Sequence, residues 1–310
     1  MSDFTGIVIR STGSWYAVKT NNEIINCRLR RKFKIKGIKT TNPIAVGDIV
    51  KFISDGKNGY ITAIEDRKNC IIRKATNLSK QTHIVAANLD LAILVVTLAY
   101  PRTSTGFIDR FLSSAEAYDV ETALVWNKID IYDARLFELT TKYAKIYSNV
   151  GYQCFMVSAK TSENIEQIKT LLKDKKTLMF GHSGVGKSEL INAIHPELKL
   201  KTKEISLYHK KGKHATTFAE MFDLPFGGSI IDTPGIKEFG LVDFNVEELS
   251  HWFPEMKKVL SNCKFYNCTH IHEPQCAVRK AVENGEISEE RYYNYLSILN
   301  NVEEQPAGWE

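Results

Sequence analysis

An eight-residue glycine-rich stretch, residues 181–188, restricts the possible folds of this chain more than any other feature. It reads Gly-His-Ser-Gly-Val-Gly-Lys-Ser, follows the apolar run 177–180 and precedes residues 189–194, whose apolar positions have helical spacing. A strand, a glycine-rich turn and a helix start in this order form the phosphate-binding P-loop. The alternative is a glycine-rich strand-to-helix turn that binds no ligand.

The chemistry of a P-loop assigns roles within this stretch. Its glycines let the backbone turn so that N–H groups point at an anion, and the helix N-terminus adds the positive end of its dipole. Lys187, which we count as catalytic, is expected to reach the β- and γ-phosphates, and the Ser188 hydroxyl to bind Mg²⁺. The predicted phosphate-binding residues are Gly181, His182, Ser183, Gly184, Val185, Gly186, Lys187 and Ser188.

Length and composition indicate a globular chain with more than one domain. The 310 residues favour two or three domains, and 43% hydrophobic and 25% charged residues are typical of soluble proteins. No apolar run approaches the roughly 20 residues that span a bilayer. Residues 1–6 lack the apolar core of a signal peptide. We therefore expect a cytoplasmic protein with no membrane partner and, in the absence of heptad repeats, a monomer.

Residues 1–68 have the pattern of a small β-barrel. Short β-rich segments at 5–10, 15–19, 44–53 and 60–64 are separated by turns of Gly, Asn, Asp and Ser. This number of short strands in so few residues fits a barrel of the oligonucleotide-binding (OB) type. The sequence therefore predicts an N-terminal OB-type domain.

A basic run, residues 28–39, lies inside this predicted barrel. Seven of its twelve residues are Lys or Arg, in a chain whose net charge is +5. Phe33 and Ile35 alternate with lysines, so that a strand here could bury one face and present cations on the other. Such a surface binds a polyanion through its phosphates, whereas the alternative is a solvated loop. The predicted RNA-binding residues are Arg28, Arg30, Arg31, Lys32, Lys34 and Lys36.

Residues 69–243 alternate between strand and helix patterns. The run 91–96 is apolar throughout, as expected of a strand covered on both faces. Repeated βα units of this kind give a mostly parallel sheet, with ligands at the carboxyl ends of its strands. The other expected strands are 122–126, 153–157, 177–180 and 228–231, and the expected helices are 107–119, 133–149 and 163–173.

Two loops that follow predicted strands could contact a guanine base. In residues 127–130, Asn-Lys-Ile-Asp, the Asp130 carboxylate can accept hydrogen bonds from guanine N1–H and the 2-amino group. Adenine offers neither donor, so Asp130 would select GTP over ATP. Asn127 and Lys128 would support the base and the loop; the alternative is that Asp130 caps a helix. The second loop, whose N–H groups could reach the guanine oxygen, is Ser158, Ala159 and Lys160.

A third polar loop follows the predicted strand 228–231. Asp232 can hold the Mg²⁺ coordination shell, and the Gly235 N–H can contact the γ-phosphate. The polar segment 212–217 can supply a second hydroxyl to Mg²⁺, from Thr216 or Thr217. Together with the P-loop and the base-reading loops, these residues resemble the translation-factor class of GTPases. The predicted magnesium ligands are Ser188, Thr216 and Asp232.

The order of these loops differs from that of an ordinary GTPase of this class. The base-reading loops at 127–130 and 158–160 precede the P-loop at 181–188, whereas the usual order is the reverse. Parallel sheets tolerate such a change because the packed layers do not depend on where the chain is cut. We therefore expect a circularly permuted GTPase domain, in which the loop after Asp232 leads directly into the C-terminal region.

The C-terminal region, residues 244–310, contains a compact set of metal-ligand residues. Three of the six cysteines fall within fourteen residues, in the pattern Cys263-x4-Cys268-x-His270-x5-Cys276. Three thiolates and one imidazole suit one structural Zn²⁺ with no position left for a catalytic water. His272 is a rival for the imidazole position, and the alternative to a metal site is a small helical domain with free thiols. We expect a mainly helical zinc-binding domain.

In this order, the barrel, the permuted GTPase domain and the Cys-x4-Cys-x-His-x5-Cys domain resemble the ribosome small-subunit-dependent GTPase A family (RsgA, also called YjeQ). The resemblance covers essentially the whole chain. It implies a bacterial GTPase that binds the small ribosomal subunit late in maturation and checks or releases assembly factors. It also implies activation by that subunit, and binding of the barrel and the zinc domain to ribosomal RNA.

The resemblance implies specific roles for several residues. It places His214 and Thr216 in a switch-like loop, and it makes Cys263, Cys268, His270 and Cys276 the zinc ligands. One departure is Ala215, where many members have another hydroxyl residue. This departure leaves Thr217 as an alternative to Thr216 for the magnesium ion.

The residue that orients the attacking water is not the usual one. Many GTPases place a Gln directly after the Asp-x-x-Gly motif, whereas this chain has Ile236, whose alkyl side chain cannot bind water. We expect His214 to take this role, because an imidazole can hydrogen-bond water at neutral pH. The alternative is that His214 only contacts RNA. Hydrolysis should therefore be slow until the small subunit orders the loop.

Three other functions compete with this interpretation. The first is a GTP-regulated RNA-binding module in which hydrolysis is incidental. The second is a permuted GTPase that acts on the large ribosomal subunit, which the barrel and the zinc domain disfavour. The third is a P-loop kinase, which the base-reading residues 127–130 disfavour because they select guanine.

Overall fold

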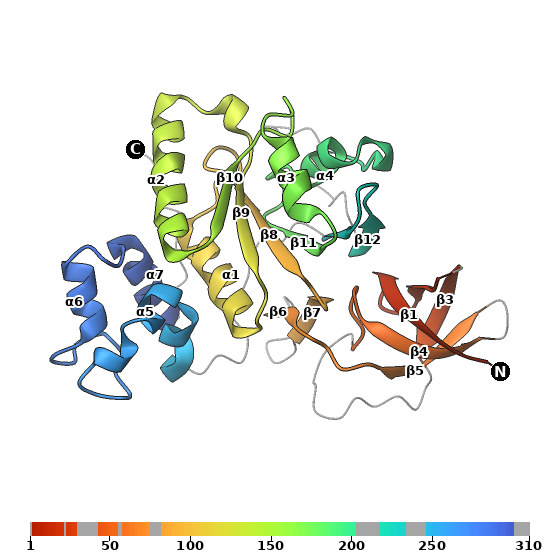
Figure 1. Ribbon diagram of the computed structural model, residues 1–310, viewed down its shortest axis with the longest axis horizontal. Coiled ribbons are helices and arrows are strands. Elements are labelled where there is room, and N and C mark those ends of the chain that lie inside the picture. The colour runs from red at the N-terminus through yellow and green to blue at the C-terminus, as the bar shows by residue number, and fades with distance from the viewer. Residues whose placement is uncertain are drawn as a thin grey trace.

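A single eleven-stranded sheet runs through two of the three parts of the molecule. The computed structural model describes residues 2–21, 23–29, 43–54, 58–74, 82–202, 218–233 and 246–300. In Figure 1 a barrel of strands lies on one side of a central α/β layer structure, and a group of short helices lies on the other. The predicted class, a barrel followed by an α/β domain and a helical C-terminal part, is confirmed.

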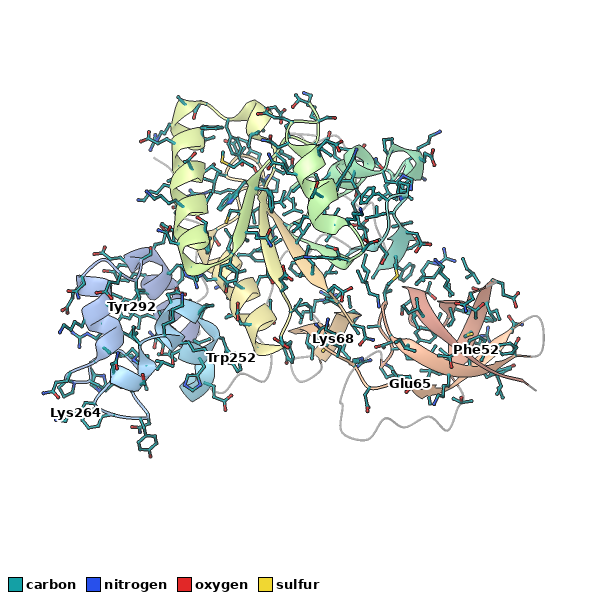
Figure 2. All side chains as sticks on the ribbon, in the orientation of Figure 1. Phe52, Glu65, Lys68, Trp252, Lys264 and Tyr292 are labelled. Carbon is teal, nitrogen blue, oxygen red and sulfur yellow. The ribbon has the colours of Figure 1, made fainter. Side chains whose placement is uncertain are left out.

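The N-terminal barrel closes because its first strand pairs with two neighbours. Strand β1 pairs with both β2 and β4, so that the order β1-β2-β3-β5-β4 returns to β1. Buried and exposed residues alternate along β3 and β4, and Phe52, labelled in Figure 2, is fully buried in the barrel core. The strands are β1 Ser2–Ser11, β2 Tyr16–Lys19, β3 Ile24–Leu29, β4 Ile49–Ser54 and β5 Gly59–Ile64.

A hairpin that the sequence pattern did not predict follows the barrel. Its strands are β6 Cys70–Lys74 and β7 Thr82–Ala87. The approach to it is fixed by a buried ion pair, in which Arg67 Nε donates to Asp48 Oδ1 over 2.7 Å. The side chain of Asn69 then donates to the Leu89 carbonyl over 2.9 Å. These contacts fix the segment that leads from the barrel into the central domain.

The central sheet is parallel except at one edge. Its order is β10-β9-β8-β11-β13-β12, and only β12 runs antiparallel to its neighbour. Strand β12 was not predicted, and it also pairs with β1 of the barrel through Arg10 and Glu220. This pairing makes the two sheets continuous. The strands are β8 Leu91–Val96, β9 Thr122–Trp126, β10 Gln153–Met156, β11 Lys176–Phe180, β12 Glu220–Asp223 and β13 Ser229–Asp232.

Helices cover both faces of the central sheet. Leu94 and Val96 of β8 face the helices α1 and α2, whereas Ile93 and Val95 face α3 and α4. All six residues of β8 are buried, as predicted for a strand between two layers. Figure 1 shows α1 and α2 on one side of the strands and α3 and α4 on the other. The helices are α1 Thr105–Ala117, α2 Ala134–Val150, α3 Ile165–Leu172 and α4 Lys187–Ile194.

The C-terminal part consists of short helices around a small core. Its elements are η3 Val246–Trp252, α5 Pro254–Lys257, η4 Leu260–Asn262, α6 Ala277–Glu283 and α7 Glu289–Leu299. The core includes Phe253 and Tyr295, whose rings meet edge to face at 5.5 Å. The short helices η1 Ile129–Ile131 and η2 Pro196–Leu198 lie in the central domain. Within the described ranges, no helix has both the length and the apolar character needed to cross a membrane.

Candidate nucleotide site and metal centre

The polar residues predicted to bind a nucleotide lie at one edge of the central sheet. Asn127 follows β9, Ser158 comes two residues after β10, Gly181 follows β11, and Asp232 ends β13. Because β8, β9, β10, β11 and β13 are parallel, their carboxyl ends meet at the same edge. The sheet therefore brings together loops that are far apart in the sequence.

The P-loop takes a backbone path that its glycines permit. Gly181, Gly184 and Gly186 have φ angles of 144°, 89° and 93°, in the region that favours glycine. A Cβ atom on Gly181 would lie 2.3 Å from the Val95 carbonyl oxygen. A Cβ atom on Gly186 would lie 2.4 Å from Asn127 Nδ2. The glycines are therefore required by close packing against β8 and the base-side loop as well as by the turn itself.

The lysine of the P-loop lies inside the curve of the loop. Lys187 is 7% exposed, and its ammonium group donates to the carbonyl oxygens of Gly181 and His182 over 2.7 and 2.9 Å. Burial lowers the pKa of Lys187 to about 8, although the nearby Asp232 carboxylate opposes this shift. Ser188, the next residue, is half-buried in the first turn of α4. An anion in the loop would stabilise the charged form of this lysine.

Asn127 joins the P-loop to both base-side loops. Its side chain is fully buried, and its Nδ2 donates to the Val185 carbonyl of the P-loop over 2.9 Å. Its Oδ1 accepts a hydrogen bond from the Ala159 N–H over 3.1 Å. Lys128 adds a second link, because its ammonium donates to the Gly184 carbonyl over 2.7 Å. The phosphate-binding and base-side loops therefore form one hydrogen-bonded unit.

Asp130 is exposed and is held by the second base-side loop. Its Oδ1 accepts from the Ser158 hydroxyl over 2.7 Å, and Ser158 Oγ accepts in turn from the Thr161 N–H. The residue that caps α2 is Asp133, whose carboxylate accepts from the Leu136 N–H over 2.7 Å. The alternative in which Asp130 serves only as a helix cap is therefore wrong for α2.

Sequence reasoning missed two residues that support this site. The Tyr132 hydroxyl accepts from the Leu98 N–H and donates to the Asn127 carbonyl, both over 3.0 Å. On the other side of the P-loop, the ring of Phe107 contacts the ring of His182 with centroids 3.9 Å apart. The Tyr132–Leu98 and Phe107–His182 contacts each join two different βα units, so no local pattern predicts them.

Several predicted residues lie outside the described residues: Arg30, Arg31, Lys32, Lys34, Lys36, His214, Thr216, Thr217 and Gly235. Of the predicted RNA-binding set, Arg28 is described. It is exposed on β3, and its guanidinium lies 3.7 Å from the centre of the Trp15 ring. Lys160 is exposed beside the buried Ala159.

The four predicted metal ligands come together in the C-terminal part. The ligand atoms of Cys263, Cys268, His270 and Cys276 all lie within 4.8 Å of one another. His270 Nδ1 is 3.4 Å from Cys276 Sγ and 3.8 Å from Cys263 Sγ. The rival residue His272 is exposed and does not belong to this cluster. The arrangement fits the tetrahedral N/S donor set that Zn²⁺ prefers.

The chemistry of these donors also fits a bound cation. Burial, together with the nearby thiols of Cys276 and Cys263, raises the pKa of Cys268 to about 12, although a hydrogen bond with the His270 backbone opposes this shift. Thiols packed in this way favour the protonated state unless a cation stabilises the thiolates, which is the effect of zinc. Figure 2 shows the neighbouring Lys264 at the outer end of this part, away from the central sheet.

A carboxylate braces the loop that carries the imidazole. Glu273 accepts hydrogen bonds from the Thr269 N–H and hydroxyl over 2.7 and 2.6 Å, and from the Ile271 N–H over 3.0 Å. Partial burial would raise the pKa of Glu273, but these hydrogen bonds outweigh it and lower the pKa to about 2. His270 has a φ of 63°, so this bracing holds the ligand loop in an unusual conformation.

The fold and the site together define a class of protein. A closed barrel precedes a sheet whose base-side loops come before the P-loop, and a Cys₃His cluster follows, so the molecule is a circularly permuted GTPase with two flanking domains. The chain belongs to the RsgA family of GTPases: the RsgA N-terminal domain matches residues 5–61 and the RsgA GTPase domain matches residues 64–242.

Similar proteins cover the whole length of this chain. A relative from Bacteroides fragilis (strain YCH46), named small ribosomal subunit biogenesis GTPase RsgA, is 55% identical over 301 residues, which are 96% of this chain and 97% of the relative. One of the same name from Flavobacterium psychrophilum is 53% identical over 305 residues, which are 97% of this chain and 94% of the relative.

Two solved structures share the fold. The structure of YjeQ from Thermotoga maritima has a TM-score of 0.76 and 38% identity, and covers 97% of this chain and 99% of that chain. The structure of YloQ, described as a circularly permuted GTPase, has a TM-score of 0.70 and 32% identity, and covers 97% of this chain and 95% of that chain. The predicted family and the predicted circular permutation are therefore confirmed.

Proposed function

We propose that this chain hydrolyses GTP as a biogenesis factor of the small (30S) ribosomal subunit and that it binds ribosomal RNA late in subunit maturation. The names of relatives that match almost the full chain at 53 to 55% identity support the ribosomal role. The observation that carries the enzymatic role is the Asn127 side chain, which hydrogen-bonds the P-loop to the base-side loop. This bridge places a phosphate site and a base site in one unit.

The nucleotide would lie along the carboxyl edge of the sheet. Its phosphates would lie within the P-loop and accept hydrogen bonds from the Lys187 ammonium. In this structure that ammonium donates to the carbonyl oxygens of Gly181 and His182. Its base would meet the exposed carboxylate of Asp130, which the Ser158 hydroxyl orients. The proposed nucleotide-binding residues are Asn127, Lys128, Asp130, Ser158, Ala159, Lys160, Gly181, His182, Ser183, Gly184, Val185, Gly186, Lys187, Ser188, Asp232 and Gly235.

A magnesium ion would accompany the nucleotide. Ser188 at the start of α4 and the buried Asp232 at the end of β13 offer a hydroxyl and a carboxylate, the oxygen donors that Mg²⁺ prefers. Thr216 would add a second hydroxyl. When bound, the ion neutralises charge that develops on the β- and γ-phosphates. The chain itself would hold the phosphates with the P-loop N–H groups and the Lys187 ammonium.

The attacking water needs a side chain to orient it, because Ile236 follows the Asp-x-x-Gly motif. We assign this role to His214, whose imidazole can accept the proton of a hydrogen-bonded water near neutral pH. Hydrolysis by the isolated protein should then be slow, and the small subunit should accelerate it by bringing the His214 imidazole to the attacking water.

The flanking parts would bind ribosomal RNA and support the GTPase. We assign residues 1–68 to the RNA-binding barrel, 69–243 to the GTPase domain and 244–310 to the zinc domain, with one structural Zn²⁺ per chain. Arg28, on the outer face of β3, begins the basic run proposed to contact RNA phosphates. The protein would act in the cytoplasm as a monomer.

The decisive experiment measures GTP hydrolysis with and without purified small subunits. The proposal expects a low rate for the protein alone and a much higher kcat with small subunits, whereas large subunits should not stimulate. ATP should neither be hydrolysed nor displace GTP. A rate that small subunits leave unchanged would overturn the ribosomal assignment, and equal use of ATP would overturn the guanine site. The variant His214→Ala should lose the stimulated rate.

A further inference from the structure

A buried ionic cluster joins the C-terminal helices to helix α1 of the GTPase domain. Arg291 of α7 is 2% exposed, and its Nη1 donates to Asp109 Oδ1 of α1 over 2.5 Å. The same guanidinium donates to both carboxylate oxygens of Glu255 in α5, over 2.5 and 3.0 Å. Asn294 Nδ2 donates to the second oxygen of Asp109 over 2.6 Å. All four carboxylate oxygens therefore have a partner in this cluster.

Burying this cluster between two domains carries a large desolvation penalty. The cluster buries one guanidinium with two carboxylates, beneath the rings of Phe253 and Tyr147, which lie 5.0 and 5.4 Å from Arg291 Cζ. Replacing a buried ion pair with apolar residues is often neutral or stabilising, so stability alone does not explain such an arrangement. Its planar and directional hydrogen bonds do fix the position of α1 relative to α5 and α7.

The same helix contacts the phosphate-binding loop through a residue close to Asp109. Phe107, in the first turn of α1, is 3% exposed and lies against the ring of His182, with the two ring planes inclined by 31°. The His182 carbonyl accepts a hydrogen bond from the Lys187 ammonium. Helix α1 is therefore in contact with the P-loop on one face and with the C-terminal domain on another.

We propose that Asp109 and Arg291 are positioning residues for the phosphate-binding loop. They fix α1 so that Phe107 holds His182, and this contact carries the effect of a partner bound to the C-terminal domain to Lys187. The route requires two positions of α1 relative to α7, the present one and a displaced one. Binding of the small subunit shifts the equilibrium between them. The role of the subunit in this inference rests on the proposed function.

The test compares two substitutions on α1 that differ in what they touch. Phe107→Leu removes the ring that contacts His182. Phe111→Leu is the matched control, because its ring lies on Phe180 of strand β11, with centroids 4.6 Å apart. Asp109→Asn keeps the shape of the cluster and removes one charge. It is preferred to removal of Arg291, which would leave two buried carboxylates unpaired and risk unfolding.

Two rates of the full-length protein are measured for each variant: release of a fluorescent GDP analogue, and GTP hydrolysis saturated with small subunits. We expect Phe107→Leu and Asp109→Asn each to lower the stimulated kcat about tenfold and to speed GDP release. Phe111→Leu should change neither rate by more than about twofold, although it loses similar apolar area. The double variant should resemble the more affected single variant, because both act on one route.

The outcomes separate the inference from the proposed function. Full stimulation in Asp109→Asn or in Phe107→Leu would overturn the inference, because each residue is a required step of the proposed route. Equal losses in Phe107→Leu and Phe111→Leu would also overturn it, because they would make α1 merely structural. If small subunits fail to stimulate the unaltered protein, the proposed function falls and GDP release alone decides the inference. In that case an unchanged release rate in Phe107→Leu overturns it. Zinc content and melting temperature identify any variant that has lost its fold.

Discussion

The nucleotide site and the metal centre are built in opposite ways. The nucleotide site lies at the edge of a sheet whose two faces bury 24 and 17 described hydrophobic residues in separate core clusters. The metal centre lies in a part whose described core cluster has nine such residues and whose longest helix has 11. In the first region the fold positions the binding residues, whereas in the second the binding residues hold the fold together.

The contacts around each site support this contrast. Around the P-loop, side chains such as Asn127 hydrogen-bond to backbone groups, which the sheet already holds in place. Around the Cys₃His cluster, the ligands themselves link segments with little regular structure, from η4 to the start of α6. Substitution of a nucleotide-binding residue should therefore weaken nucleotide binding, whereas substitution of a metal ligand should unfold the C-terminal part.

The largest effect should follow from Cys268→Ser. This substitution removes one of the four proposed zinc ligands, and structural zinc contributes on the order of 10 kcal/mol to small domains of this kind. We expect loss of bound zinc and protease sensitivity confined to residues 246–300, with GDP binding retained. The control is Cys154→Ser, which changes a half-buried cysteine of β10 outside the cluster. Metal analysis and limited proteolysis would measure both, and an intact, protected C-terminal part without zinc would refute the contrast.

The second largest effect should be a loss of nucleotide affinity without a loss of stability. Asp130→Asn replaces the exposed carboxylate proposed to accept two guanine hydrogen bonds, and GDP affinity should fall about 1,000-fold. The melting temperature should stay unchanged, because Asp130 bonds only to a neighbouring hydroxyl. The control is Asp133→Asn, which keeps an acceptor at the N-cap of α2. A large fall in melting temperature with Asp130→Asn would show that this region, too, depends on its binding residues for folding.

The candidate nucleotide site could be proposed from the sequence because its residues carry local signals. Glycines with positive φ, a lysine at a helix start and polar residues directly after apolar strands are visible without knowing the fold. The cysteine spacing of the metal centre is equally local. The strands and helices that were predicted in the central domain lie within one or two residues of the observed bounds, because continuous apolar runs alternate with helical periods.

The contacts that the sequence did not predict depend on residues far apart in the chain. Strand β12, Glu220–Asp223, has two acidic residues in four, and it is extended because β13 and β1 pair with it on either side. Arg291 and Asp109 are 182 residues apart, and each lies on a helix where a charged residue is ordinarily exposed. The local sequence pattern indicates neither pairing, since each arises only when two of the three parts have come together.

A smaller effect concerns the proton on Lys187. Burial lowers the pKa of this lysine to about 8, and the phosphates of a bound nucleotide would favour its charged form. Nucleotide binding should therefore take up a proton when the pH exceeds about 8, and affinity should fall as the pH rises from there. Below about pH 7 the lysine is already charged, so its proton should no longer make nucleotide affinity depend on pH.

Calorimetry in two buffers of different ionisation enthalpy measures this proton directly. At about pH 8.5, GDP binding should take up about three quarters of a proton, the neutral fraction of a group with a pKa of about 8. Guanosine, which has no phosphate, is the control and should take up none. Binding of GDP without proton uptake would mean that the phosphates do not act on Lys187.

The smallest effect concerns Tyr132, which lies in the nucleotide site but stabilises the fold around it. Its hydroxyl bonds to groups within the central domain: the Leu98 N–H, the Asn127 carbonyl and the Thr97 hydroxyl. Tyr132→Phe should therefore lower the free energy of unfolding by about 1 kcal/mol and weaken GDP binding only slightly. Tyr100→Phe removes a hydroxyl from a residue that is 76% exposed and should change neither. If Tyr132→Phe weakens GDP binding by more free energy than it removes from stability, this hydroxyl and not the sheet positions the loop at Asn127. The nucleotide site would then depend on its own side chains, as the metal centre does.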